Sequence, residues 1–195
     1  MLIEALLAIH IAVLGYWLGS EFVINSEYRY VCRTPSLPFA ERNKLMEHVL
    51  DVDQHVRYAL VLQAVLGTIL AALIGYIPGG ATLAWIAAAV GVVWLAFVEV
   101  IHHLRNAPAG KTLALIDRVI RYVLMASLFA VGGAVAMNIV PLPVWLAAKL
   151  ALFGGVIACG VGIRLSIIAF YGVWREIEAQ GSNDAREQEI RWIYT

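Results

Sequence analysis

Four ionisable side chains lie within long apolar stretches of this sequence, and they are the first candidates for chemistry. They are His10, Glu99, Lys149 and Arg164. Such groups are costly inside a bilayer, so they mark sites for ligands, ions or protons. At about 1.5 Å per helical residue, His10 and Lys149 both lie roughly 10 Å below the same membrane surface, which predicts that they face one another. Arg164 has Glu99 as its natural counter-ion, and this pair is predicted to be structural.

The stretch around His10 has further features that suit a bound cofactor. Trp17 follows His10 by nearly two helical turns and therefore shares its face. Gly15 and Gly19 form a small-xxx-small step, which allows another helix or a flat cofactor to approach closely. A lone intramembrane histidine is either a ligand or a hydrogen-bonded packing residue, and these residues alone leave both interpretations open.

A second group of histidines is predicted on the cytoplasmic side. Its members are His55, His102 and His103. Glu99 precedes His102 by about one turn, and Asp51 precedes His55 by four residues and is expected to orient its imidazole. A metal site, a second haem or a quinone-facing proton relay could be assembled here, while polar side chains that only reach the membrane surface explain the pattern equally well. Asp53 and Arg57 are predicted to form an interfacial ion pair.

Five apolar runs must position these side chains. Each reaches or exceeds the ~20 residues that a helix needs to cross a bilayer. Open sheet edges or irregular backbone would leave N–H and C=O groups unpaired in lipid. The runs are Leu2–Ile24, Val56–Tyr76, Ala81–Ile101, Ile116–Val140 and Pro143–Tyr171. The sequence therefore predicts an all-α integral membrane bundle with five transmembrane helices.

Composition and charge place this bundle in a cell membrane. The chain is 62% hydrophobic and 14% charged, with a mean hydropathy of +0.79, which excludes an ordinary soluble domain. Lys and Arg gather on one side of the spans, whereas the turns Ile77–Gly80 and Pro141–Pro143 contain none. The N-terminus is therefore predicted outside and the C-terminus in the cytoplasm of a multi-pass protein, most simply of a bacterial inner membrane. Nucleic acid is not an implied partner.

The connections divide the chain into one membrane domain and a tail. Residues 1–176 are predicted as a single five-helix transmembrane domain. Its first connection contains an amphipathic segment at about 36–55, which is expected to lie along the cytoplasmic membrane surface. Residues 177–195 are predicted as a cytoplasmic tail with a short helix, because Asp184 to Glu187 has the spacing of a capping box. Lipid surrounds the spans, and either polar element could dock a membrane or cytoplasmic protein.

Two motifs carry a resemblance to a known group of membrane proteins. The first span contains H-x(6)-W-x-G from His10 to Gly19, and the fifth contains W-x-x-x-K-L from Trp145 to Leu150. In these two helices the chain resembles the copper-resistance-D-type proteins and the related integral-membrane protoporphyrinogen oxidases. The oxidase branch is understood to bind haem b, with its histidine and lysine as important residues. The resemblance implies that His10 ligates haem iron, that Lys149 is a functional partner, and that Trp17 lines the porphyrin.

These features together favour a haem b-binding membrane redox protein. It would move electrons between a quinone or a dehydrogenase partner and an acceptor, as one subunit of a membrane complex. Whether it is an enzyme stays open. The second hypothesis is a non-enzymatic structural or assembly subunit without a cofactor, since small-residue seams also bind other spans. A small-solute or copper permease is the third hypothesis, and it ranks last because five spans without an internal repeat offer little basis for alternating access.

Overall fold

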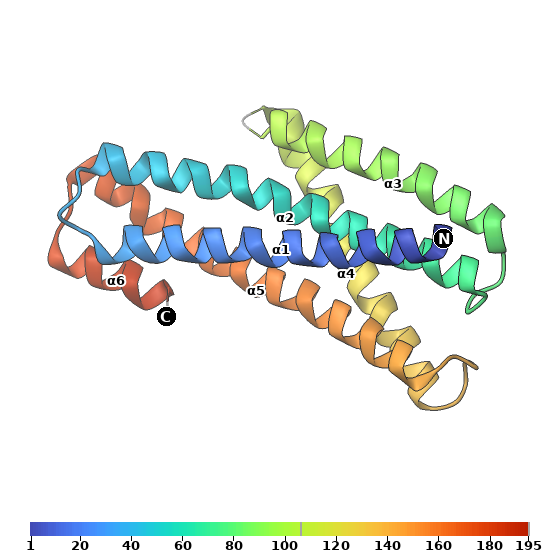
Figure 1. The fold of residues 1–195 in the computed structure, drawn as a ribbon. Coiled ribbons are helices and arrows are strands. Elements are labelled where there is room, and N and C mark those ends of the chain that lie inside the picture. Colours follow the sequence, from blue (N-terminus) through green and yellow to red (C-terminus); the bar gives the residue numbers. More distant parts are fainter. Residues whose placement is uncertain (106, 195) are drawn as a thin grey trace. The chain divides into compact units, whose positions relative to one another are not determined.

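The protein is all-α throughout residues 1–105 and 107–194, the part that the computed structural model describes (Figure 1). The helices are α1 (Leu2–Arg33), α2 (Phe39–Ile74), α3 (Gly80–His103), α4 (Pro108–Ala136), α5 (Val144–Gln180) and α6 (Asp184–Tyr194). The first five are each long and apolar enough to cross a membrane. The predictions of an all-α fold and of five helices of spanning length are therefore confirmed.

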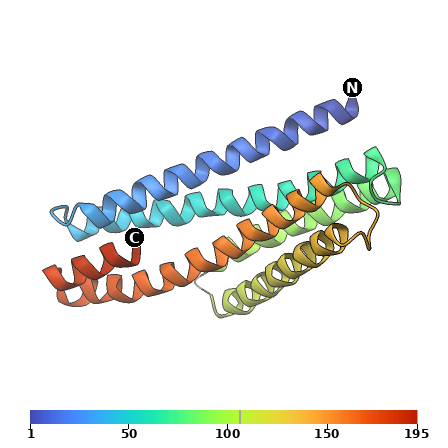
Figure 2. The same ribbon diagram turned by 90° about the horizontal axis from the view of Figure 1, so that it is seen from below.

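The chain forms two compact units, residues 1–105 and residues 106–195. In the first unit α2 packs against both α1 and α3, and in the second α5 packs against both α4 and α6 (Figures 1 and 2). The sequence predicts instead one domain over residues 1–176. The single domain stays a prediction.

The segment at 36–55 is not a separate surface helix. Helix α2 runs without a break from Phe39 to Ile74, so the amphipathic segment continues directly into the second span. The N-cap Pro38 begins the helix, and the residues from Phe39 to Leu66 include no proline or glycine that would interrupt its hydrogen bonds. His48 Nδ1 lies 2.9 Å from Glu27 of α1, so this part of α2 faces a neighbouring helix. The polar ends of α1 and α2 extend their hairpin beyond the apolar spans.

Helices α2 and α3 are joined tightly and pack closely. Gly75, with φ of 92°, ends α2, and Gly79, with φ of 116°, precedes α3; both values lie in the left-handed region that favours glycine. Further along the seam, Gly91 lies against Val65. A Cβ atom at Gly91 would stand only 2.8 Å from Val65 Cγ2. The absence of a side chain at Gly91 therefore lets the two helices approach.

The second unit has its own close seam and ends in a docked helix. A Cβ atom at Gly154 of α5 would lie 3.2 Å from the ring of Phe129 in α4. The short tail helix is confirmed as α6, which packs against α5. Its first turn is capped by Asn183, whose Oδ1 accepts a hydrogen bond from the backbone N–H of Arg186 at 2.9 Å. Helix α5 continues beyond the last apolar run, which ends at Tyr171, as far as Gln180.

Candidate functional site

His10 and Trp17 lie on the face of α1 that packs against α2. The backbone carbonyl of His10 accepts a hydrogen bond of 3.0 Å from Nε2 of Gln63, which is 8% exposed. A Cβ atom at Gly67 of α2 would lie 3.7 Å from Cε1 of the His10 ring. Trp17 is buried two turns further along α1. The shared face predicted for His10 and Trp17 is thus the α1–α2 seam.

The fit of haem b to His10 can be tested on this contact. A Cβ atom added at Gly67 would already touch the His10 ring, so the imidazole and α2 are too close together for a porphyrin to lie between them. Sites for molecules of this class enclose about 300–1,000 Å³. The two best-formed hollows of the described residues have volumes of about 170 and 260 Å³, and His10 lines neither. The α1–α2 seam therefore does not fit the group that the resemblance implies.

Lys149 and Arg164 belong to α5 in the second unit. Lys149 is exposed, and its Nζ lies 5.2 Å from the centre of the Trp145 ring, a cation–π distance. The predicted meetings of Lys149 with His10 and of Arg164 with Glu99 join residues of different units, so they stay predictions. The Asp53–Arg57 ion pair is present in the first unit, with Arg57 Nη2 2.9 Å from Asp53 Oδ2.

Glu99 is the centre of a cluster of polar side chains between α2 and α3, which we call the Glu99 cluster. Its members are Gln54, Tyr58, Glu99 and His103. Tyr58 Oη donates a hydrogen bond to Glu99 Oε2. His103 Nε2 lies 2.9 Å from Glu99 Oε1. Gln54, which is 6% exposed, donates to the carbonyl of Val98 at 3.2 Å and also approaches Glu99 Oε2 at 3.5 Å. The carboxylate thus stands between a phenol and an imidazole.

The other predicted histidines have different partners from those expected. His55 Nδ1 hydrogen-bonds to Tyr16 Oη of α1 at 2.5 Å, and its ring packs edge-on against Tyr58. Asp51 approaches His102 Nε2 at 3.9 Å and Arg105 Nη1 at 3.3 Å. The Asp51 carboxylate therefore contacts α3 and the residue Arg105 that follows it. The side chain that hydrogen-bonds to His55, and so orients it, is Tyr16. In the part of the chain that the structure describes, no three His, Cys, Asp or Glu side chains gather to hold a metal ion.

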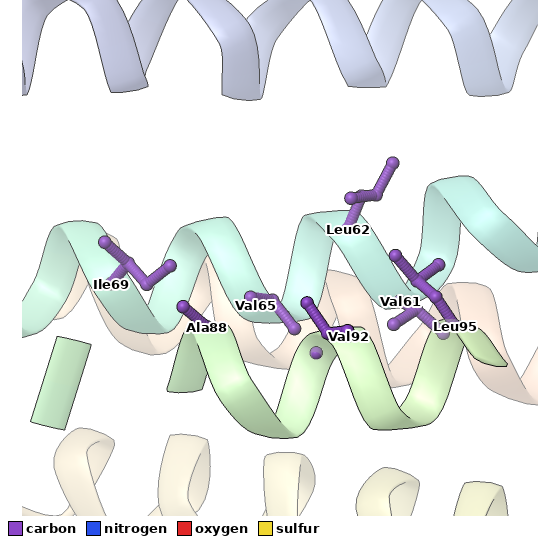
Figure 3. A pocket seen from close by; sticks show the side chains of 8 residues that line it. Val61, Leu62, Val65, Ile69, Ala88, Val92 and Leu95 are labelled. Carbon is purple, nitrogen blue, oxygen red and sulfur yellow. The ribbon is translucent and has the colours of Figure 1, made fainter. Parts of the chain in front are cut away.

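An apolar groove begins beside the Glu99 cluster. It has a volume of about 170 Å³ and lies between α2 and α3 (Figure 3). Its walls are Val61, Leu62, Val65, Ile69, Ala88, Gly91, Val92 and Leu95. Leu62 follows Tyr58 by one helical turn, and Leu95 precedes Glu99 by one turn. The groove and the cluster therefore form one continuous surface, polar at one end and apolar along the rest.

Sequence reasoning identified Glu99 and His103 but missed Tyr58 and Gln54. Both lie within one turn of His55, which begins the second predicted span. Tyrosine and glutamine are common near the end of a span, so their residue types alone do not indicate a site. Their spacing from His55 on one helix could have indicated that they belong to the same polar group. Their contact with Glu99 becomes evident only when α2 is packed against α3.

No protein-family model, curated protein or solved structure matches this chain with significance. The resemblance to the copper-resistance-D-type proteins and protoporphyrinogen oxidases therefore stays a prediction carried by two short motifs. The function has to be argued from the geometry of the Glu99 cluster and the groove beside it.

Proposed function

We propose that this chain is an integral membrane redox protein in which the Glu99 cluster exchanges protons with a quinone. The observation that carries the proposal is the position of the Glu99 carboxylate, between a phenol and an imidazole at the end of an apolar groove. A quinone has the same division of character, with a polar head that gains or loses protons and an apolar tail. The head would meet Tyr58, Glu99 and His103, and the tail would lie in the groove.

The chemistry of the cluster suits this ligand. Oxidation of a quinol releases two protons and two electrons, so a nearby carboxylate and imidazole are suitable proton acceptors. In the reverse direction, Tyr58 and His103 are donors for the quinone oxygens. The side chains of Glu99 and His103 are 43% and 72% exposed, which leaves them accessible to a lipid-soluble molecule. Proton exchange at this surface needs no rearrangement of α2 and α3.

The electrons must be exchanged with a separate redox group. Haem b at His10 is the electron carrier that the resemblance implies, but the close approach of α2 to the His10 ring leaves no space for it in the α1–α2 seam. A dehydrogenase or another membrane subunit would serve equally as the electron partner, which agrees with a role in a complex.

The proposal includes an orientation and a location. With the N-terminus outside and the C-terminus in the cytoplasm of a bacterial inner membrane, the Glu99 cluster lies toward the cytoplasmic end of its spans. Protons released at the cluster would then enter the cytoplasmic side. The basis for this orientation is the distribution of Lys and Arg in the sequence.

Binding of a short-chain quinone to the purified full chain tests the proposal. We expect decylubiquinone to bind in detergent micelles, as measured by equilibrium dialysis, and Tyr58→Phe or Glu99→Gln to weaken binding at least tenfold. Tyr122→Phe, a tyrosine of α4 with a partly exposed side chain, is the matched control and should bind as the parent does. Unchanged binding in both cluster variants would refute the assignment.

A structural subunit without a cofactor is the second candidate, and one observation favours it. Gln54 and Gln63 are nearly buried and donate to backbone carbonyls of neighbouring helices, at Val98 and His10 respectively. Such interhelical hydrogen bonds stabilise a bundle without any ligand. Purification of a stable chain that is colourless and binds no quinone would favour this candidate, and its co-purifying partners would then identify the complex.

A further inference from the structure

The outer face of α1 changes from apolar to basic along one line of side chains. Ile11, Leu18 and Phe22 lie on this line and are exposed, Phe22 by 73%. The line continues at helical spacing through Ser26, Arg29 and Arg33, which are also exposed. One face of a single helix thus offers an apolar strip followed by two guanidinium groups.

The basic end of this face is hollowed. Ser26, Arg29, Tyr30 and Arg33 line a depression of about 260 Å³, which is distinct from the groove between α2 and α3. Two guanidinium groups, a hydroxyl and a phenol supply hydrogen-bond donors in one place, and guanidinium matches the geometry of phosphate oxygens. The neighbouring acidic residue, Glu27, faces α2 and contacts His48 there at 2.9 Å. The four residues that line the depression include two arginines and no acid, so its charge is positive.

The depth of this hollow matches the headgroup layer of a bilayer. The apolar run of α1 ends at Ile24, and Arg29 follows it by about 7 Å at 1.5 Å per residue. The headgroup region on each side of the hydrocarbon core is of the same thickness, roughly 5–8 Å. A phosphate held at Arg29 would therefore have its acyl chains beside Phe22 and Leu18.

We propose that the outer face of α1 binds one anionic phospholipid, with the headgroup phosphate at Arg29 and Arg33 and the acyl chains along Phe22, Leu18 and Ile11. The basic hollow and the apolar strip together match the two parts of a phospholipid, whereas a free phosphate would use only the hollow. An anionic headgroup is favoured over a zwitterionic one because two positive charges face it. This site does not depend on the proposed quinone site.

Native mass spectrometry of the full chain in detergent micelles tests the site. We expect phosphatidylglycerol to bind more tightly than phosphatidylcholine. Each basic residue near a charged membrane contributes about fivefold in affinity, so Arg29→Gln with Arg33→Gln should weaken phosphatidylglycerol binding at least tenfold. Ser26→Glu, which keeps both arginines but adds a negative charge to the hollow, should weaken it as well.

Matched controls separate a built site from general attraction. Lys44→Gln with Lys111→Gln removes two exposed positive charges elsewhere and should leave phosphatidylglycerol binding within twofold of the parent. An equal loss in this control would overturn the site in favour of bulk charge. Displacement of the lipid by millimolar inorganic phosphate would overturn it in favour of a free-phosphate site, and undiminished binding to the Arg29 and Arg33 variant would overturn it outright.

Discussion

Substitution of Gly91 by alanine is expected to destabilise the first unit, because α2 and α3 approach closely there. A Cβ atom at Gly91 would lie 2.8 and 2.9 Å from the two γ-carbons of Val65, and carbon atoms in contact are about 3.5–4.0 Å apart. Rotation of Val65 about χ1 cannot remove the conflict, since its hydrogen can replace only one of the two methyl groups at a time. The helices must therefore separate slightly.

The size of the effect follows from two opposing terms. Overpacking of this kind costs about 1–3 kcal/mol, whereas alanine is favoured over glycine inside a helix by about 1 kcal/mol. Because at least one methyl group stays too close, the cost of overpacking outweighs this gain, and we expect a net loss of up to about 2 kcal/mol in the free energy of unfolding of Gly91→Ala. The double variant Val65→Ala with Gly91→Ala removes both conflicting methyl groups and should regain most of that loss.

Equilibrium unfolding in mixed SDS micelles, followed by far-ultraviolet circular dichroism, measures these differences. Gly19→Ala in α1 is the matched control, because nothing lies within 4 Å of the added Cβ atom. This control should be as stable as the parent or up to about 1 kcal/mol more stable. If Gly91→Ala behaves like Gly19→Ala, or if Val65→Ala does not change its effect, the close approach of α2 and α3 is refuted.

Three further predictions concern the cofactor, an ion pair and the orientation. If haem b is held by His10, the reduced protein shows a b-type α band with near one haem per chain, and His10→Ala loses the Soret band; full occupancy in that variant would exclude His10. Asp117 is 5% exposed and 2.9 Å from the arginine one turn later, so Asp117→Asn should cost about 1–3 kcal/mol in the same unfolding assay. Asp53→Asn, at a more exposed ion pair, should lower the free energy of unfolding by at most about 1 kcal/mol. Equal losses in the two variants would contradict the argument from burial. In a chain without its native cysteines, Ser182→Cys should be labelled by an impermeant maleimide only from the cytoplasmic side and Pro78→Cys only from outside, and the reverse pattern would invert the topology.

The helices of this protein were largely predictable from its sequence, but their lengths were not. Long apolar runs must be helical in lipid, so the spans were found by composition alone. The continuation of α2 back to Phe39 was missed because its first part, rich in Glu, Asp, Arg and His, has the pattern of a separate surface helix. In the structure this first part of α2 is continuous with the rest of the helix, and His48 contacts Glu27 of α1. It therefore extends the α1–α2 hairpin. Amphipathic spacing indicates that the apolar face of a helix is covered. The spacing does not show whether lipid or another helix covers that face.

The candidate site was predictable in part, for a similar reason. Rarity in an apolar segment indicates Glu99, and the adjacent histidines at the end of the third span indicate His103; both residues belong to the cluster. The partner expected for His55 was Asp51, yet the structure places Tyr16 there. Partners within one helix follow from spacing, as at Asp53 and its arginine four residues later. Partners on different helices depend on which faces meet, and that is a property of packing.

The amino-acid sequence is enough to predict that this chain is helical and that five of its helices can cross a membrane, because exposing unpaired polar groups to lipid is costly. It also shows which ionisable groups those helices contain. The contacts between these groups depend on how the helices pack. The close approach allowed by Gly91 brings α3 against α2, and only that pairing puts Tyr58 against Glu99 and opens an apolar groove one turn away. The pairing of α1 with α2 likewise brings the His10 ring close to Gly67. Helical periodicity depends on residues that are close in sequence, so it can be predicted. The contacts that give a side chain its chemistry join residues that are far apart in sequence.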